Sequence, residues 1–169
     1  MMVSDVEFAI SQVASIANIS TISFHYSTNE GKVFRVIDKI REIGAKPLLA
    51  LDLSTNLEVV HELLDSGELD GLLFMGIHPG VLTQVHRPEN VIRRIKKLKT
   101  GRDWDDKLII QIDGGFNFET SSSLRDAGVN SFVGGSSSIY SGCNSTKDYE
   151  ERALIIKNNI SSVRNKIGA

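Results

Sequence analysis

The chain has 169 residues, a length that suits a single domain, 1–169, with a hydrophobic core of ordinary size. Its formal net charge of -2 argues against nucleic acid or an anionic membrane as a partner, and its one cysteine excludes an internal disulfide and a CxxC site. The start, MMVSDVEF, does not read as a signal peptide, and no apolar run approaches the ~18 residues that cross a bilayer, so we expect a cytoplasmic protein.

Two hydrophobic periodicities alternate along the chain. Apolar residues spaced three or four apart predict helices, and continuous apolar or β-branched runs predict strands. In chain order the predicted elements are a helix over 5–17, a strand over 20–25, a helix over 32–44, a strand over 47–52, a helix over 56–67, a strand over 71–77, a helix over 88–99, a strand over 108–113, a helix over 118–128, a strand over 131–135 and a helix over about 146–166.

This alternation predicts an α/β protein with about five parallel β/α units preceded by a helix. Because the strands are continuous apolar runs, we expect them to be covered on both faces. Five strands do not close a barrel, and a doubly wound open sheet is one interpretation. Glycine and polar residues follow three successive strands, as HPG, DGG and GGSS, which is instead the habit of a (β/α)8 barrel. The pattern alone leaves both folds open.

Three segments carry a resemblance to a known family. LLFMGIHPG at 72–80, QIDGGFNFET at 111–120 and AGVNSFVGGSS at 127–137 resemble the second half of the ribulose-phosphate 3-epimerase family, and SFH at 23–25 and MMVS at 1–4 resemble earlier parts of it. The resemblance implies a (β/α)8 TIM barrel of which this chain carries the last five units. We therefore expect an incomplete barrel, truncated at its N-terminus.

The resemblance implies reversible C3 epimerisation of a ketose phosphate, D-ribulose 5-phosphate to D-xylulose 5-phosphate, through an enediolate. Such a reaction uses two acid/base groups on opposite faces and a cation near the enediolate oxygens. Asp113, in the DGG motif, matches a family residue that is both a catalytic acid/base and a ligand of a divalent metal ion, Zn, Fe or Mn. The alternative role of Asp113 is to cap the following turn.

The resemblance also implies a phosphate site and an apolar wall. The phosphate-contacting positions are Gly80, Gly114, Gly115, Gly135 and Ser136, and the methionines that pack over the enediolate are Met2 and Met75. Glycines expose backbone N–H groups, and a helix N-terminus after GGSS would favour a dianion. The alternatives are tight turns for the glycines and core filling for the methionines. Leu82 and Thr83 stand where the family has two further glycines.

Several family positions precede the segment that MMVS resembles and have no counterpart here. They are a serine, one catalytic aspartate and two metal-binding histidines. We therefore expect that this chain alone does not hold the metal and is inactive. The alternative functions are a non-catalytic or inactive phosphosugar-binding relative and an allulose-6-phosphate 3-epimerase-type enzyme.

The remaining polar residues receive structural expectations. His25, at a strand end, either points into the site or is a hydrogen-bonded structural histidine, and Asp52 is expected to cap a helix or to be solvated. The basic cluster of the helix over 88–99 is expected to be its solvated side; it comprises Arg93, Arg94, Lys96, Lys97 and Lys99. Two long open edges and an uncovered apolar interior predict a homo-oligomer. The resemblance implies a phosphorylated ketose as the ligand.

Overall fold

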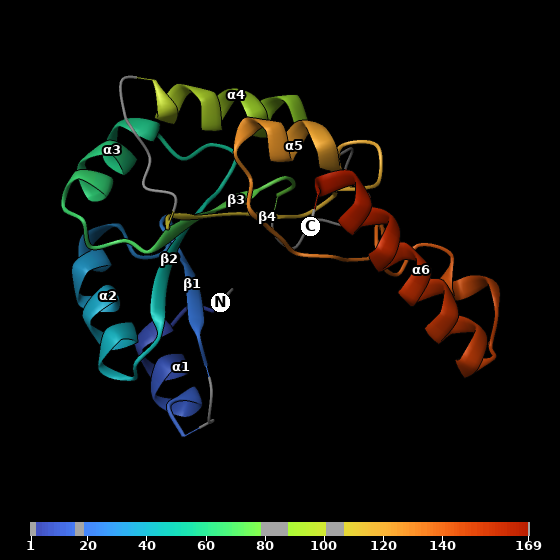
Figure 1. Cartoon of the computed structure of the whole chain (residues 1–169). Helices are drawn as coiled ribbons and strands as arrows, with labels where there is room; N and C mark the ends of the chain where they lie inside the picture. The colour runs from blue at the N-terminus through green and yellow to red at the C-terminus, as the bar shows by residue number, and fades with distance from the viewer. Residues whose placement is uncertain (1–2, 16–18, 79–87, 101–106, 169) are drawn as a thin grey trace.

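The computed structural model of the chain describes residues 3–15, 19–78, 88–100 and 107–168. One parallel sheet with helices on its outer side makes up most of this part (Figure 1). The α-helices are α1 (Val6–Val13), α2 (Val33–Glu42), α3 (Leu57–Asp65), α4 (Pro88–Lys99), α5 (Ser121–Ala127) and α6 (Tyr149–Ile167). The strands are β1 (Thr21–His25), β2 (Lys46–Leu51), β3 (Gly71–Met75), β4 (Ile109–Asp113) and β5 (Ser131–Phe132), and two 3-10 turns are η1 (Glu30–Lys32) and η2 (Cys143–Ser145).

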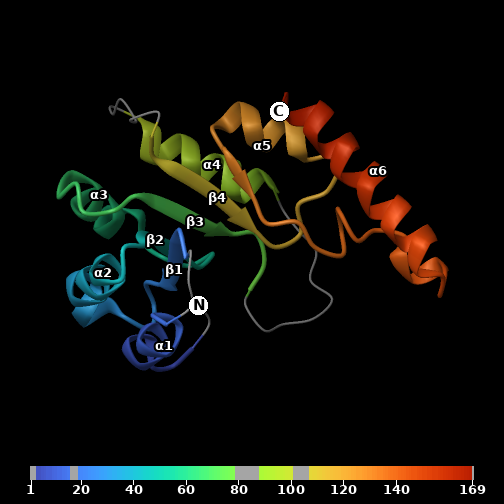
Figure 2. The same ribbon diagram turned by 60° about the horizontal axis from the view of Figure 1, so that its bottom comes forward.

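The order of the strands decides between the two folds that the sequence left open. The order is β1-β2-β3-β4-β5, and each strand pairs in parallel with the next one along the chain. A doubly wound sheet reverses its strand order at a switch point, and no reversal occurs here. Figures 1 and 2 show α2, α3, α4 and α5 in an arc around the outer side of the sheet. The described chain is therefore a section of a (β/α) barrel wall.

Side chains alternate between the two faces of each strand, and the outer face carries the main core. There the strands pack on the helices through large apolar side chains that are almost fully buried: Phe24, Leu49, Leu72, Phe74, Ile110 and Ile112. The inner, concave face carries a smaller buried cluster of Ala50, Leu73 and Met75. Residues one position along from the core side chains, including His25 and Asp113, therefore belong to the concave face.

The expected uncovered interior and two long edges are not what the structure shows. Leu48, Ala50, Leu73 and Met75 on the concave side of β2 and β3 are at most 5% exposed. The strand predicted over 131–135 is only two residues long, because the chain turns at the glycines that follow, so the edge at β5 is short. The only long edge among the described strands is β1. The apolar surface that would drive association is smaller than the sequence suggested.

The helix ends follow the local sequence. Asp5 caps α1 and Asp148 caps α6, each through a carboxylate that accepts a backbone N–H. The helix predicted over 118–128 begins only at Ser121, because the Asn117 side chain accepts the N–H groups of Glu119 and Thr120 and holds them in a turn.

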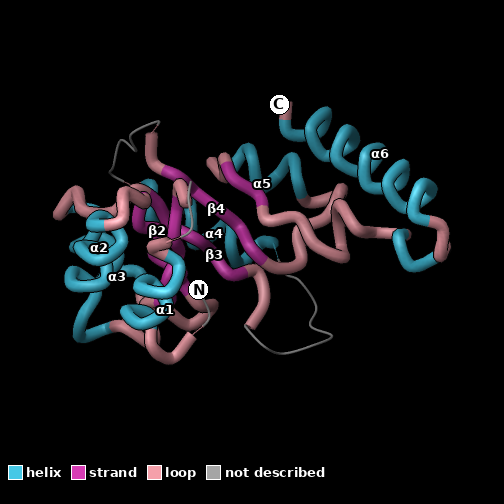
Figure 3. Tube along the Cα trace, turned by 90° about the horizontal axis from the view of Figure 1, so that it is seen from below, coloured by secondary structure: helices cyan, strands magenta, loops and turns pink. Residues whose placement is uncertain are grey.

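Helix α6 lies at the far end of the chain and is held mainly at its C-terminal end. Lys166 Nζ donates to Phe118 O at 2.8 Å, and Ser122 Oγ donates to Lys166 O at 3.1 Å. Its N-terminal half extends away from the sheet (Figures 1 and 3). Tyr149 and Leu154 in this half are exposed. None of the helices in the described ranges is long and apolar enough to cross a membrane.

Candidate active site

Asp113 is the last residue of β4, where the strand reaches the carboxyl edge of the sheet. Its neighbours Ile112 and Ile110 face the helices, so alternation places the Asp113 side chain on the concave face, opposite Met75 in register. The side chain is half-buried, and no group among the described residues donates a hydrogen bond to its carboxylate or forms an ion pair with it. The alternative in which Asp113 caps its own turn is therefore not seen, and the carboxylate is available for chemistry.

The two glycines after Asp113 have a conformational reason to be glycines. Gly114 and Gly115 adopt φ angles of 95° and 73°, which L residues rarely take. A Cβ on Gly114 would also lie 2.5 Å from Cγ1 of Ile77, in the loop after β3. The turn that follows Asp113 thus requires glycine at its first position for backbone and packing reasons alike. The interpretation of Gly114 and Gly115 as phosphate contacts stays a prediction.

The loop after β5 does not form the helix N-terminus that the GGSS motif suggested. Gly135 N–H donates to Ser138 Oγ at 3.1 Å, and Gly135 O accepts from Ser138 N and Tyr140 N, both at 3.1 Å. Residues 136–142 are a series of turns, so no helix dipole points at this loop. The expectation was wrong because serine side chains compete for the backbone groups that a helix would use. Ser136 remains exposed at the loop surface.

The loops after β4 and β5 are joined to each other. Ser137 Oγ donates to Phe116 O at 3.0 Å, and the rings of Phe116 and Phe132 pack with centroids 5.2 Å apart. The structure thus brings the predicted positions Gly115 and Ser136 onto two adjacent, connected loops. Met2, Gly80, Leu82 and Thr83 lie outside the described residues.

Met75 ends β3 and is 5% exposed on the concave face, where it belongs to the cluster with Ala50 and Leu73. It stands directly opposite Asp113 in the β3–β4 register. The structure therefore places an apolar wall beside the carboxylate. The role of Met75 as a wall over the enediolate stays a prediction.

A second polar cluster on the concave side was missed as a unit by the sequence analysis. His25 Nδ1 lies 3.0 Å from Asp52 Oδ1, and Ser27 Oγ donates to the other oxygen of the same carboxylate. His25 is 7% exposed, and the side chain of Asp52 is 17% exposed. The expectation that Asp52 caps a helix or is solvated was wrong, because Asn56 caps α3 instead. Both residues end neighbouring strands, and that shared position is the signal that could have linked them.

Arg94 is also misassigned by the sequence analysis. Its guanidinium donates to Leu53 O and, at 2.9 Å, to Thr55 O, so it ties α4 to the loop after β2. Burial lowers the pKa of Arg94 from its ordinary value, and the negative charge of Asp52 partly opposes this. Arg94 is therefore half-buried, whereas the other basic residues of α4 are exposed as expected.

The metal expectation can be tested on the donor groups. Within the described ranges, no group of three or more His, Cys, Asp or Glu side chains could hold a metal ion. Among the residues that the structure describes, Asp113 belongs to no such group, and His25 with Asp52 supplies only two donors. These residues do not fit a divalent ion by themselves.

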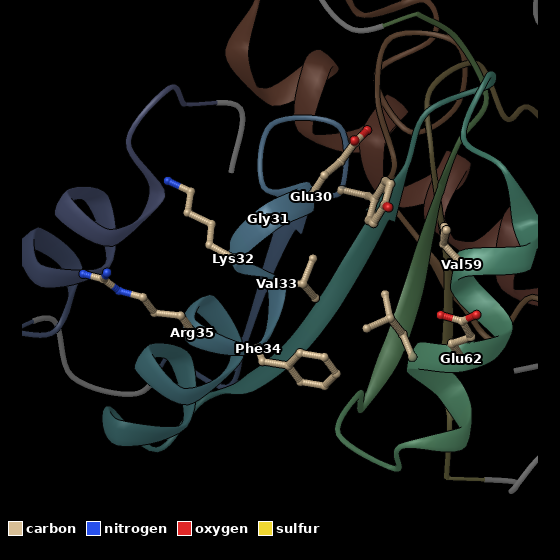
Figure 4. A pocket seen from close by; sticks show the side chains of 10 residues that line it. Glu30, Gly31, Lys32, Val33, Phe34, Arg35, Val59 and Glu62 are labelled. Carbon is tan, nitrogen blue, oxygen red and sulfur yellow. The ribbon is translucent and has the colours of Figure 1, made fainter.

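A cavity of about 420 Å³ lies on the other side of the sheet, between α2 and α3 (Figure 4). Its walls include Lys32, Phe34 and Arg35 on one side and Val59 and Glu62 on the other. It belongs to the helical layer, and neither Asp113 nor His25 lines it. Its mixed charges and apolar walls indicate no single ligand chemistry.

Comparison with known proteins gives the family. The model of the ribulose-phosphate 3 epimerase family matches residues 1–140. The ribulose-phosphate 3-epimerase of Methanocaldococcus jannaschii is 30% identical over 138 residues, which cover 80% of this chain and 56% of that protein. That of Bacillus subtilis is 36% identical over 106 residues, which cover 60% and 46%. The chain spans about half the length of the curated relatives that it matches.

Solved structures support the fold. The 3-hexulose-6-phosphate synthase of Salmonella typhimurium superposes with a TM-score of 0.64 at 15% identity, over 95% of this chain and 71% of that one. At this identity the likeness shows the fold alone, which agrees with the sequential strand order. The sequence matches and the shared architecture lead to one conclusion: the chain belongs to the ribulose-phosphate 3-epimerase family.

Proposed function

We propose that this protein takes part in the reversible epimerisation of a ketose phosphate at C3, with D-ribulose 5-phosphate and D-xylulose 5-phosphate as the two epimers. The observation that carries the proposal is the carboxylate of Asp113 at the carboxyl end of β4, to which no described residue donates a hydrogen bond. The C3 proton of a 2-keto sugar is acidified by the neighbouring carbonyl. A half-buried carboxylate without a hydrogen-bond donor is suited to remove it.

The substrate phosphate is assigned to the loops after β4 and β5. In a (β/α) barrel the phosphate site usually lies in the loops of the last strands. Here Ser137 joins those loops, and Gly115 and Ser136 lie at their surface, where a backbone N–H and a hydroxyl would contact phosphate oxygens. Met75 would then cover the reacting carbons and keep water from the enediolate.

Two further features belong to the proposal. A divalent metal ion, Zn, Fe or Mn, would require ligands other than Asp113, since the described residues supply no complete set. The protein is proposed to be a homo-oligomer of the cytoplasm. The β1 edge and the exposed apolar side chains of α6 support association.

A second candidate function is phosphosugar binding without catalysis. Leu82 and Thr83 replace two glycines of the family's phosphate turn, and the described residues contain no metal cluster. A binding protein would need the phosphate loops but no proton transfer. An allulose-6-phosphate 3-epimerase-type activity shares the same chemistry and differs only in the length of the sugar.

The test is exchange of the C3 hydrogen with solvent deuterium, followed by ¹H NMR on D-ribulose 5-phosphate and, in parallel, D-allulose 6-phosphate. The 169-residue chain alone is expected to be inactive, so the assay uses a longer protein in which the first three β/α units of a family member precede residue 1. We expect this longer protein to accelerate exchange and Asp113→Asn in it to lower the rate about 10²-fold or more, the usual contribution of an acid/base group. Binding, followed by calorimetry, should survive this change, because the amide keeps the size of the carboxylate. Equal exchange rates for the two proteins would refute the role of Asp113. Binding without exchange would establish the second candidate.

A further inference from the structure

The cavity between α2 and α3 has an apolar floor and an exposed aromatic ring at its edge. Its buried wall residues are Val33 and Leu63, and the half-buried Val59 lines it as well. Phe34 also lines the cavity and is 53% exposed. Figure 4 shows Phe34 on the side of α2 that faces Val59 and Glu62, whereas the side chain of Arg35 extends the other way. An apolar hollow beside an exposed phenylalanine is typical of a surface that binds another protein.

The walls offer no fixed polar partner to a small ligand. Binding sites for small molecules combine apolar walls with a few precisely placed polar groups. Here the buried wall residues are apolar, whereas the charged residues Glu30, Arg35 and Glu62 are exposed. A solvated, flexible side chain does not fix the orientation of a bound molecule. The cavity therefore fits an apolar side chain of another protein better than a small polar ligand.

The two helices beside the cavity carry opposite charges. Residues 32–42, which include α2, have four basic and two acidic side chains, whereas α3 has three acidic side chains and no lysine or arginine. In the described ranges no salt bridge involves Lys32 or Glu62, and Arg35 pairs at 2.8 Å with Glu7 of α1 instead of with α3. A basic rim and an acidic rim thus lie on the two sides of one apolar hollow.

This arrangement is complementary to a second copy of itself. In a two-fold symmetric dimer the same patch occurs on both subunits, so that residue i contacts residue j and j contacts i. With the two-fold axis between α2 and α3, the basic rim of each copy faces the acidic helix of the other. The exposed Phe34 of each copy then meets the apolar hollow of its partner. Opposite charges face each other at both ends of such a contact.

We propose that two copies of this chain associate through the α2–α3 surface, which comprises Tyr26, Lys32, Phe34, Val59 and Glu62. Phe34 is the anchor that enters the partner's cavity, and Lys32 of each copy pairs with Glu62 of the other. The inference rests on the homo-oligomer included in the proposed function and names its interface. It does not depend on the proposed reaction.

The size of the α2–α3 surface predicts weak association. The two helices have 10 and 9 residues, and at about 1.5 Å per residue each is roughly 14–15 Å long. Two such helices, each about 10 Å wide, present a face of roughly 300 Å², which is less than the ~800 Å² per partner of a stable interface. We therefore expect a dimer that dissociates on dilution, and sedimentation equilibrium over a range of concentrations measures its dissociation constant.

Phe34→Glu tests the anchor, because it places a charge where an apolar side chain is needed. We expect the dissociation constant to rise about 30-fold or more, as for a residue at the centre of an interface. The control is Phe8→Glu, which makes the same change at an exposed phenylalanine of α1 that does not line the cavity and should match the unchanged chain. Equal dissociation constants for Phe34→Glu and the unchanged chain overturn the inference and leave the proposed reaction intact.

Charge reversal tests the two-fold pairing. Lys32→Glu and Glu62→Lys each place like charges opposite one another at both contacts, so each variant alone should associate about 10-fold more weakly at low salt. An equal mixture of the two variants should associate as well as the unchanged chain, because a mixed dimer has opposite charges at both contacts. A mixture that associates no better than the separate variants overturns the inference.

A further measurement needs no variant and does not depend on how a variant folds. A carbodiimide joins an amine to a carboxylate with which it is in contact, and an equal mixture of unlabelled and ¹⁵N-labelled chains distinguishes links between copies from links within one copy. We expect a link from Lys32 to Glu62 between copies. Dimers linked only through other residues overturn the inference. A chain that stays monomeric at every concentration refutes the homo-oligomer and the inference with it, whereas C3 exchange tests the proposed reaction separately.

Discussion

Gly114 offers a sharp test of how the turn after Asp113 is built. Replacement by alanine adds one methyl group at a backbone φ of 95°, with the new Cβ placed 2.5 Å from Cγ1 of Ile77. A left-handed conformation costs an L residue roughly 1–2 kcal/mol, and forcing an extra carbon into a packed site costs about 1–3 kcal/mol more. We expect Gly114→Ala to lower the free energy of unfolding by about 3 kcal/mol, or Tm by about 6–12 °C.

Two matched variants separate the contribution of backbone conformation from that of packing. Gly44 has a φ of 78° and nothing within 4 Å of its added Cβ, so Gly44→Ala should lose only the conformational term, about 1 kcal/mol. Gly31 has open space and an ordinary φ, so Gly31→Ala should change stability by less than about 0.5 kcal/mol.

Urea unfolding followed by circular dichroism, at one protein concentration for all four proteins, measures the differences. We expect Gly31→Ala to be the most stable of the three variants, Gly44→Ala the next and Gly114→Ala the least stable. If Gly114→Ala and Gly44→Ala unfold at the same urea concentration, the contact with Ile77 carries no cost and the packing argument is wrong.

Three other outcomes follow from the described contacts. Arg94→Met keeps the aliphatic part of the side chain but loses two hydrogen bonds to the loop after β2, so we expect the free energy of unfolding in urea to fall by roughly 1–3 kcal/mol. An unchanged free energy of unfolding would show that these hydrogen bonds do not stabilise the fold. Asn29 is 2% exposed, and its Oδ1 has no hydrogen-bond partner among the described residues. Asn29→Ala should therefore lower the free energy of unfolding by only about 1 kcal/mol in the same measurement, less than the loss of a fully bonded buried amide would. If α6 drives association, Leu154→Glu with Ile160→Glu should lower the mass found by sedimentation, and an unchanged mass would place the interface elsewhere.

Much of the fold was predictable because its signals are local. The period of the apolar residues separates the helices from the strands, and residues such as Asp5, Pro88 and Gly128 mark helix ends through their own backbone and side-chain chemistry. The predicted ends of helices were wrong where a side chain accepts a backbone N–H group that a helix would use, as Asn117 and Ser138 do. Strand order could not be predicted from the pattern, because sequential and doubly wound sheets have the same alternation of elements.

The candidate site, like the fold, could be predicted only in part from the sequence. By itself, the sequence determined the family and the position of Asp113 at a strand end before two glycines, because these features lie within a few residues of one another. Only the tertiary structure decided that Asp52 binds His25, 27 residues away, and that Arg94 leaves the solvated face of its helix. The physical reason is the register of parallel strands, which brings the carboxyl ends of β1, β2 and β4 onto one concave face and is set by packing of the whole sheet.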